Sequence, residues 1–183
     1  MIQPISGAML ISDPFLKDPN FMRTVVFLCE HNAEGSFGFV LNRPFDQTLD
    51  HFLPDLTGHT IRVFYGGPVQ TDTLHFLHRL PQYISGGVEV ADGVFWGGNF
   101  DSVISLIMKG RMHPSDIRLF LGYSGWSSGQ LDEEMKSKSW LTTMGKANLV
   151  FHKDSQEIWP DAIREMDNKY HPIVNYPIDP QLN

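Results

Sequence analysis

Cysteine and long apolar runs are scarce in this sequence. Cys29 is the single cysteine among 183 residues, which excludes an intramolecular disulfide framework and a cysteine zinc cluster. The longest apolar runs are about five residues, far below the roughly 18 that a membrane-spanning helix needs. The first residues lack the basic segment and apolar stretch of a signal peptide. These features predict a cytoplasmic protein without a membrane segment.

Positive charge is also scarce. Lys and Arg number 14 against 21 Asp and Glu, and the formal net charge is -7. The sequence contains no run rich in Lys and Arg. Because an acidic surface repels a phosphate backbone, direct nucleic-acid binding is not expected.

Motifs for nucleotides and metals are missing as well. The sequence has no P-loop, no dinucleotide-binding fingerprint and no H-E-x-x-H pattern. His75 and His78 are spaced like a metal pair, but residues three apart on a strand point to opposite faces. The sequence therefore predicts neither a cofactor nor a metal site.

Short strands separated by turns dominate the remaining pattern. Apolar runs and alternation predict strands over 7–12, 24–30, 37–41, 61–65, 73–78, 88–90, 94–96 and 116–122. Helical spacing predicts a short helix capped by Asp46 and longer helices over 99–109, 130–139 and 160–169, while 147–151 fits a strand or a turn. Several adjacent strands resemble hairpins, so the predicted class is α+β with a mixed, mostly antiparallel sheet.

The length favours one domain over residues 1–183. Three prolines interrupt the end of the chain, so we expect 171–183 to form an extended tail rather than a helix.

The predicted hairpin over 29–44 carries polar residues that its core does not require, among them His31 and Asn42. Pro44 holds Arg43 in an extended conformation, which directs a guanidinium able to bind a carboxylate or phosphate bidentately. In the alternative interpretation, Arg43 pairs with an acidic neighbour and Asn42 bonds the backbone of a turn. The sequence leaves both interpretations open.

Residues 125–129 match the G-x-S-x-G pattern of a nucleophile elbow, in the strand–turn–helix context that such an elbow requires. Ser127 would be the nucleophile, and His152 or His171 would have to serve as its base. Small residues also suit any tight turn between a strand and a helix. Trp126 lies in the same glycine-rich turn, where it can pack on a ligand or partner.

Cys29 and His31 suggest a second nucleophile–base pair. Residues two apart on a strand share a face, but their Cβ atoms are separated by roughly 6.5 Å. A working pair needs hydrogen-bond contact, so a buried strand cysteine is the favoured interpretation.

Several blocks in a fixed order resemble the YqgE/AlgH family of small bacterial proteins. They are Asp-Pro-Asn-Phe-Met-Arg (18–23), Cys-Glu-His-Asn (29–32), Gly-Phe-Val-Leu-Asn-Arg-Pro (38–44), Tyr-Gly-Gly-Pro-Val (65–69), Leu-Gly-Tyr-Ser-Gly-Trp (121–126), Gly-Gln-Leu (129–131) and Ser-Trp-Leu (139–141). The specificity lies in the ordered set, which covers most of residues 7–145. After residue 151 the match is loose.

The resemblance implies a compact α+β fold whose bent sheet forms a pseudo-barrel with helices packed around it. It does not imply an enzyme. The family has been linked to regulation of alginate production and of transcription. Because this sequence has no helix-turn-helix pattern and its charge opposes DNA, we interpret such regulation as indirect.

We therefore expect a cytoplasmic, non-catalytic binding or regulatory protein whose partner is a small anionic ligand or another protein. The alternative is a hydrolase that uses Ser127. The predicted binding groove is lined by Arg23, His31, Asn42, Arg43, Gly66, Gly67 and Trp126.

Overall fold

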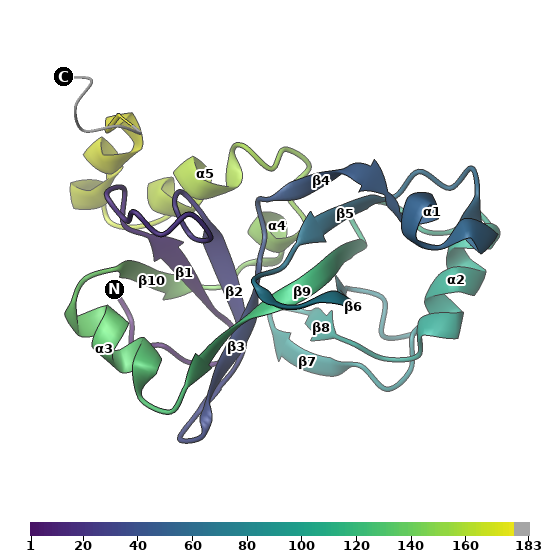
Figure 1. The fold of residues 1–183 in the computed structure, drawn as a ribbon, viewed down its shortest axis with the longest axis horizontal. Coiled ribbons are helices and arrows are strands. Elements are labelled where there is room, and N and C mark those ends of the chain that lie inside the picture. Colours follow the sequence, from purple (N-terminus) through teal and green to yellow (C-terminus); the bar gives the residue numbers. More distant parts are fainter. Residues whose placement is uncertain (178–183) are drawn as a thin grey trace.

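A bent sheet of ten strands organises residues 1–177, the part of the chain that this computed structural model describes (Figure 1). The last six residues of the predicted tail, 178–183, lie outside the described residues. In chain order the elements are β1 (Ala8–Ser12), β2 (Val25–Asn32), β3 (Gly35–Val40), β4 (Pro44–Thr48), α1 (Leu49–Phe52), η1 (Pro54–Leu56), β5 (Arg62–Tyr65), β6 (Val69–His78), β7 (Val88–Ala91), β8 (Val94–Trp96), α2 (Phe100–Met108), β9 (Ile117–Ser127), α3 (Gln130–Lys136), β10 (Trp140–Met144), α4 (Ala147–Val150), α5 (Ile158–Arg164) and the 3-10 helix η2 (Asn168–Asn175).

The strands follow the order β10-β1-β2-β3-β9-β6-β8-β7, and β5 joins both β9 and β4. Within residues 1–177 every strand pair is antiparallel except β5 with β9. The curled sheet forms a half-barrel with helices around it (Figure 1). The predicted fold class, a bent and mostly antiparallel sheet with packed helices, is confirmed.

The long strand β9 connects the two halves of the sheet. Its first residues pair with β5 and β6, and its last four pair with β3. Gly122 lies between these two stretches with φ of 71°, and a Cβ atom there would lie 2.5 Å from the carbonyl oxygen of Gly67. Glycine therefore permits both the local bend and the close approach of the two backbones.

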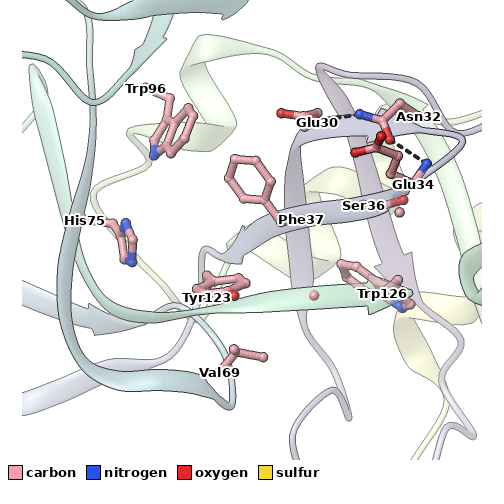
Figure 2. A pocket seen from close by; sticks show the side chains of 12 residues that line it. Glu30, Asn32, Glu34, Ser36, Phe37, Val69, His75, Trp96, Tyr123 and Trp126 are labelled. Carbon is pink, nitrogen blue, oxygen red and sulfur yellow. Dashed lines mark hydrogen bonds between the residues drawn. The ribbon is translucent and has the colours of Figure 1, made fainter. Parts of the chain in front are cut away.

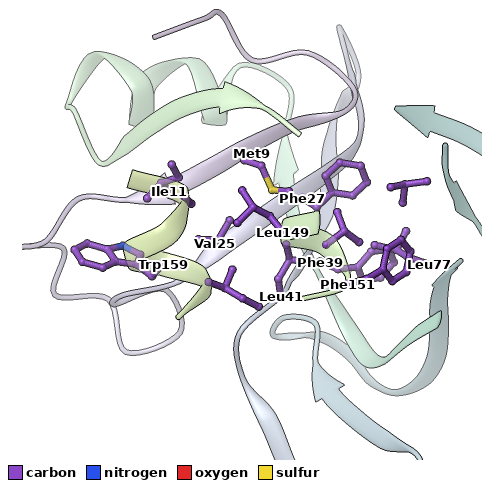
Figure 3. Close-up of a cluster of buried hydrophobic side chains, with 14 of the residues drawn as sticks. Met9, Ile11, Val25, Phe27, Phe39, Leu41, Leu77, Leu149, Phe151 and Trp159 are labelled. Carbon is purple, nitrogen blue, oxygen red and sulfur yellow. The ribbon is translucent and has the colours of Figure 1, made fainter. Parts of the chain in front are cut away.

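The core of the first half is built on β2, whose residues Val25–Cys29 are buried on both faces as the dense apolar run predicts. Val25 and Phe27 face a cluster that includes Leu149 and Trp159 from the C-terminal helices (Figure 3). Their neighbours on the opposite face belong to a separate cluster with Trp140. Because each buried large apolar side chain contributes about 1.5 to 3 kcal/mol, these layers hold β1, β2 and β3 firmly.

The second half packs α1, η1 and α2 against β5, β6 and β9. Asn99 caps α2 as predicted, because its Oδ1 accepts the backbone N–H of Ser102 at 2.9 Å. No helix among the described residues has both the length and the apolar character needed to cross a bilayer.

One local expectation was wrong, and one strand was not predicted. Asp46 does not cap a helix but lies inside β4, which pairs with β5, and the short helix begins only at Leu49. The edge strand β10 was not predicted, although it pairs with β1 over its whole length. Both differences arise because pairing with a distant strand decides the local conformation.

The C-terminal segment also differs from expectation. The late helix spans Ile158–Arg164 rather than 160–169. For 147–151 the sequence left a strand or a turn open, and this segment forms a single helical turn. The tail is a 3-10 helix up to Asn175 instead of extended chain. Pro172 is compatible with this helix because its fixed φ suits a 3-10 turn, and Ile173 and Val174 pack on the core.

Candidate functional site

A cleft of about 500 Å³ opens where β3, β6, β8 and β9 meet (Figure 2). Hereafter we call it the aromatic cleft. Its lining residues are Glu30, Asn32, Glu34, Gly35, Ser36, Phe37, Val69, His75, Trp96, Tyr123, Gly125 and Trp126.

Aromatic side chains from three strands form the wall of this cleft. The ring of Phe37 on β3 lies 4.7 Å from that of Trp96 on β8 and 6.1 Å from that of Tyr123 on β9, measured between centroids. Figure 2 shows these rings around one hollow. Gly125 is on the same face of β9 as Tyr123, and a Cβ atom there would lie 3.2 Å from the Tyr123 ring. The absence of a side chain at Gly125 keeps this part of the cleft open.

His75 supplies a polar group in the aromatic wall. Its ring lies 5.4 Å from that of Phe39 and 5.8 Å from that of Tyr123. Its Nε2 atom is buried and has no hydrogen-bond partner among the described residues. Burial lowers the pKa of His75 from its ordinary value, so the ring is neutral near pH 7. An unpaired buried nitrogen is costly, so the position of His75 calls for an explanation beyond packing.

Carboxylates dominate the rim of the cleft. Glu30 near the end of β2 and Glu34 in the β2–β3 turn are both exposed. Asn32 orders this turn, because its Nδ2 donates to Glu30 at 2.5 Å and its Oδ1 accepts the backbone N–H of Glu34 at 2.8 Å. The lining includes no lysine or arginine. The local field is therefore negative and favours a positively charged group.

The predicted site residues do not gather in this cleft. Arg23 lies over the ring of Trp159 at 4.2 Å and donates to the carbonyl oxygen of Tyr176 at 2.6 Å. Arg43 donates to the carbonyl oxygen of Met22 at 3.0 Å.

Asn42 bridges two backbone segments. Its Oδ1 accepts the backbone N–H of Val25, and its Nδ2 donates to the carbonyl oxygen of Arg23. This matches the part of the alternative interpretation in which Asn42 bonds backbone groups. The other part is not matched, because no ion pair among residues 1–177 involves Arg43.

Gly66 and Gly67 are buried where backbones cross. A Cβ atom on Gly66 would lie 2.3 Å from the carbonyl oxygen of Gly122, and one on Gly67 would lie 2.3 Å from that of Tyr123. Their positions have a packing reason, and a role in binding stays a prediction.

His31 on β2 and Trp126 on β9 both pair with Ser36 of the intervening strand β3. His31 lines a neighbouring shallow pocket and its Nδ1 is 2.7 Å from Ser36 Oγ. Trp126 is the one predicted residue that lines the aromatic cleft, but it is only 5% exposed and donates its indole N–H to Glu134 at 2.9 Å. The groove predicted from all seven residues is thus divided among several places.

Ser127 is the last residue of β9, and a turn at 128–129 leads into α3. Its Oγ is 3.2 Å from Gln130 Oε1, and no histidine among residues 1–177 hydrogen-bonds to it. The strand–turn–helix context is present, but a base in contact with the nucleophile is not.

The described residues also contain no cluster of three or more His, Cys, Asp or Glu side chains that could hold a metal ion.

Sequence reasoning missed His75, Trp96 and Tyr123 as site residues. Their signal is weak because each fits the apolar pattern of its own strand. The hairpin over 29–44 was recognised as more polar than a core requires, and its turn, through Asn32 and Glu34, forms one rim of the cleft.

A family model described as AlgH-like matches residues 9–171. Two relatives, UPF0301 proteins of Chlorobium limicola and Cytophaga hutchinsonii, are each 40% identical to this chain. Both alignments cover 97% of this chain. They cover 95% of the C. limicola protein and 98% of the C. hutchinsonii protein.

Two solved structures share the fold. The solution structure of the AlgH protein from Pseudomonas aeruginosa has a TM-score of 0.72 and 29% identity, over 97% of this chain and 99% of that one. A crystal structure of a Corynebacterium diphtheriae protein has a TM-score of 0.80, over 96% of this chain and 94% of that one. Because its sequence identity is 19%, this likeness supports the fold alone.

Proposed function

The chain belongs to the AlgH-like family. We propose that this member of the family is a non-catalytic protein that binds a small organic cation in the aromatic cleft. The observation that carries the proposal is the combination of aromatic walls, a carboxylate rim and no basic lining residue. The ligand class differs from the anion expected from the sequence. That expectation depended on Arg43, which donates to a backbone carbonyl instead.

The physical argument is one of complementary charge. Aromatic faces attract cations placed within about 6 Å, with a gain of roughly 0.5 to 2 kcal/mol. Glu30 and Glu34 add attraction from the rim, and the neutral His75 adds no repulsion from the wall. Apolar walls with a few directed polar groups are typical of small-molecule sites.

The proposal also includes a cytoplasmic location and an indirect role in regulating transcription. A cytoplasmic protein with one unpaired, buried Cys29 fits a reducing compartment. Any effect on transcription would be indirect and would depend on whether the cleft is occupied. The net charge of -7 does not favour direct contact with DNA.

The experiment is an NMR titration that follows the indole N–H signals of Trp96 and Trp126. The probes are benzylamine as cation, benzyl alcohol as the uncharged comparison and benzoate as anion. We expect benzylamine to bind most tightly and benzoate least. Changing Glu34 to Gln should weaken benzylamine binding about two- to fivefold, because a rim charge contributes up to about 1 kcal/mol.

The control is Glu89→Gln, which removes an equally exposed carboxylate outside the cleft and should leave the affinity unchanged. If benzoate binds as tightly as benzylamine, or if no probe shifts either indole signal, the proposal is wrong.

A further inference from the structure

A second cavity, of about 300 Å³, shares no lining residue with the aromatic cleft. We call it the Arg118 cavity. It is lined by Thr60, Ile61, Arg62, Phe64, His113, Pro114, Ser115, Ile117, Arg118, Phe151, His152 and Lys153. The wall thus carries two arginines, a lysine and two histidines but no carboxylate, in a chain whose net charge is -7.

Arg118 is 6% exposed and has unused hydrogen-bonding capacity. Its Nη1 donates to the carbonyl oxygen of Leu41 at 3.2 Å, and its Nη2 donates to that of His152 at 2.6 Å. The guanidinium carbon lies 4.2 Å from the centroid of the Phe64 ring. Because a guanidinium has five N–H groups, these two bonds leave three for another acceptor.

Among residues 1–177, no carboxylate forms an ion pair with Arg118. None of the ion pairs found among residues 1–177 involves Arg118, Arg62 or Lys153, and His152 pairs with Asp161 at 3.4 Å. Burial, and then Arg62, lower the pKa of Arg118 to about 9, so the side chain remains charged at neutral pH. A buried charge without a partner is destabilising, and an anion from solution would offset that cost.

We propose that the Arg118 cavity binds a small oxyanion, a phosphate or carboxylate group, held by the guanidinium of Arg118. The planar fork of an arginine matches both groups bidentately. Arg62 and Lys153 are exposed and line the same cavity, so they would attract the anion at its mouth. The site is independent of the cation proposed for the aromatic cleft.

The test is thermal unfolding of the intact protein in sodium phosphate and in sodium acetate, each against sodium chloride at equal ionic strength. A ligand that binds only the folded state raises the Tm, so we expect an increase in phosphate, acetate or both over chloride. The larger increase identifies the preferred oxyanion. Changing Arg62 or Lys153 to Gln should weaken the affinity about two- to fivefold. Lys17→Gln, an exposed change outside the cavity, should have no effect.

Arg118→Met removes the charge and keeps most of the side-chain length, and it should abolish the increase. If this variant does not fold, the double variant Arg62→Gln/Lys153→Gln replaces it in the Tm measurement, because both residues are exposed and their substitution should leave the fold intact. The proposal is overturned if neither oxyanion raises the Tm above chloride, or if the double variant responds like the unaltered protein. Benzylamine binding, measured on the same samples, reports separately on the aromatic cleft.

Discussion

The carboxylate of Glu134 accepts the indole N–H of Trp126 at 2.9 Å. The same oxygen accepts the indole N–H of Trp140 at 2.7 Å. Glu134 lies on α3, Trp126 on β9 and Trp140 on β10. One side chain thus joins a helix to two strands beneath it and fixes the buried rings of Trp126 and Trp140 in one hydrophobic cluster.

Replacing Glu134 by Ala should therefore destabilise the fold. Two largely buried indole N–H groups would lose their acceptor, and each unsatisfied group costs about 1 to 3 kcal/mol. We expect a loss of about 2 to 4 kcal/mol in the free energy of unfolding, measured by urea denaturation. Glu133→Ala on the exposed face of α3 is the matched control, with an expected change within about 0.5 kcal/mol. Equal effects of the two substitutions would contradict this account.

Gly67 tests whether the predicted glycine pair is needed for packing. It has φ of 151°, and a Cβ atom would lie 2.3 Å from the carbonyl oxygen of Tyr123. Gly67→Ala should cost about 3 kcal/mol or more, because strained backbone and overpacking act together. Gly58→Ala, at φ of 90° with no atom within 4 Å, should cost only about 1 to 2 kcal/mol from backbone conformation. Similar losses in thermal or urea unfolding would remove the packing explanation.

Stability should fall as the solution is acidified, in part through His75. Burial lowers the pKa of His75 in the folded state, whereas the unfolded chain has the ordinary value of about 6.5. As pH falls below about 6.5 the unfolded state therefore takes up a proton before the folded state does, and stability is lost. His75→Phe should therefore reduce the difference in the free energy of unfolding between pH 7.5 and pH 5.5. These two pH values lie about one unit above and below the unfolded-state pKa of histidine.

The exposed His51→Gln is the control for this pH dependence, and we expect it to leave the difference as it is in the unaltered protein. A His75→Phe variant with undiminished pH dependence would show that other groups account for the acid sensitivity. His78 is one such group, because burial lowers its pKa as well.

Ser127 should not behave as an activated nucleophile. Its Oγ is near Gln130 rather than a histidine, and an unactivated serine hydroxyl is a weak nucleophile at neutral pH. We expect a fluorophosphonate probe to leave the protein unlabelled. Labelling that disappears in Ser127→Ala would instead support the hydrolase alternative.

Much of the fold could be predicted from the sequence because the signals are local. The strand over Val25–Cys29 follows from one dense apolar run, and the cap at Asn99 follows from one residue and the helical spacing after it. The 3-10 helix that contains Pro172 was mistaken for extended chain, because its conformation depends on packing against α5 and the core.

The candidate sites could be predicted only in part. The hairpin with His31 and Asn42 was recognised as polar beyond the needs of a core. For Arg43 the sequence left a ligand and an acidic neighbour open, and the structure gives it a backbone carbonyl instead. Arg118 was not singled out at all, because an arginine inside an apolar strand is read as a solvent-facing residue until the neighbouring layers are known.

By itself, the sequence determined the α+β class, the order of most elements and the membership of a family, since these depend on periodicity and on blocks of neighbouring residues. Only the tertiary structure decided which side chains share a site. Phe37, His75, Trp96 and Tyr123 come from four strands that meet because β9 bends and pairs with both β3 and β6. Pairing between strands distant in sequence depends on the whole hydrophobic core, so no local pattern contains it.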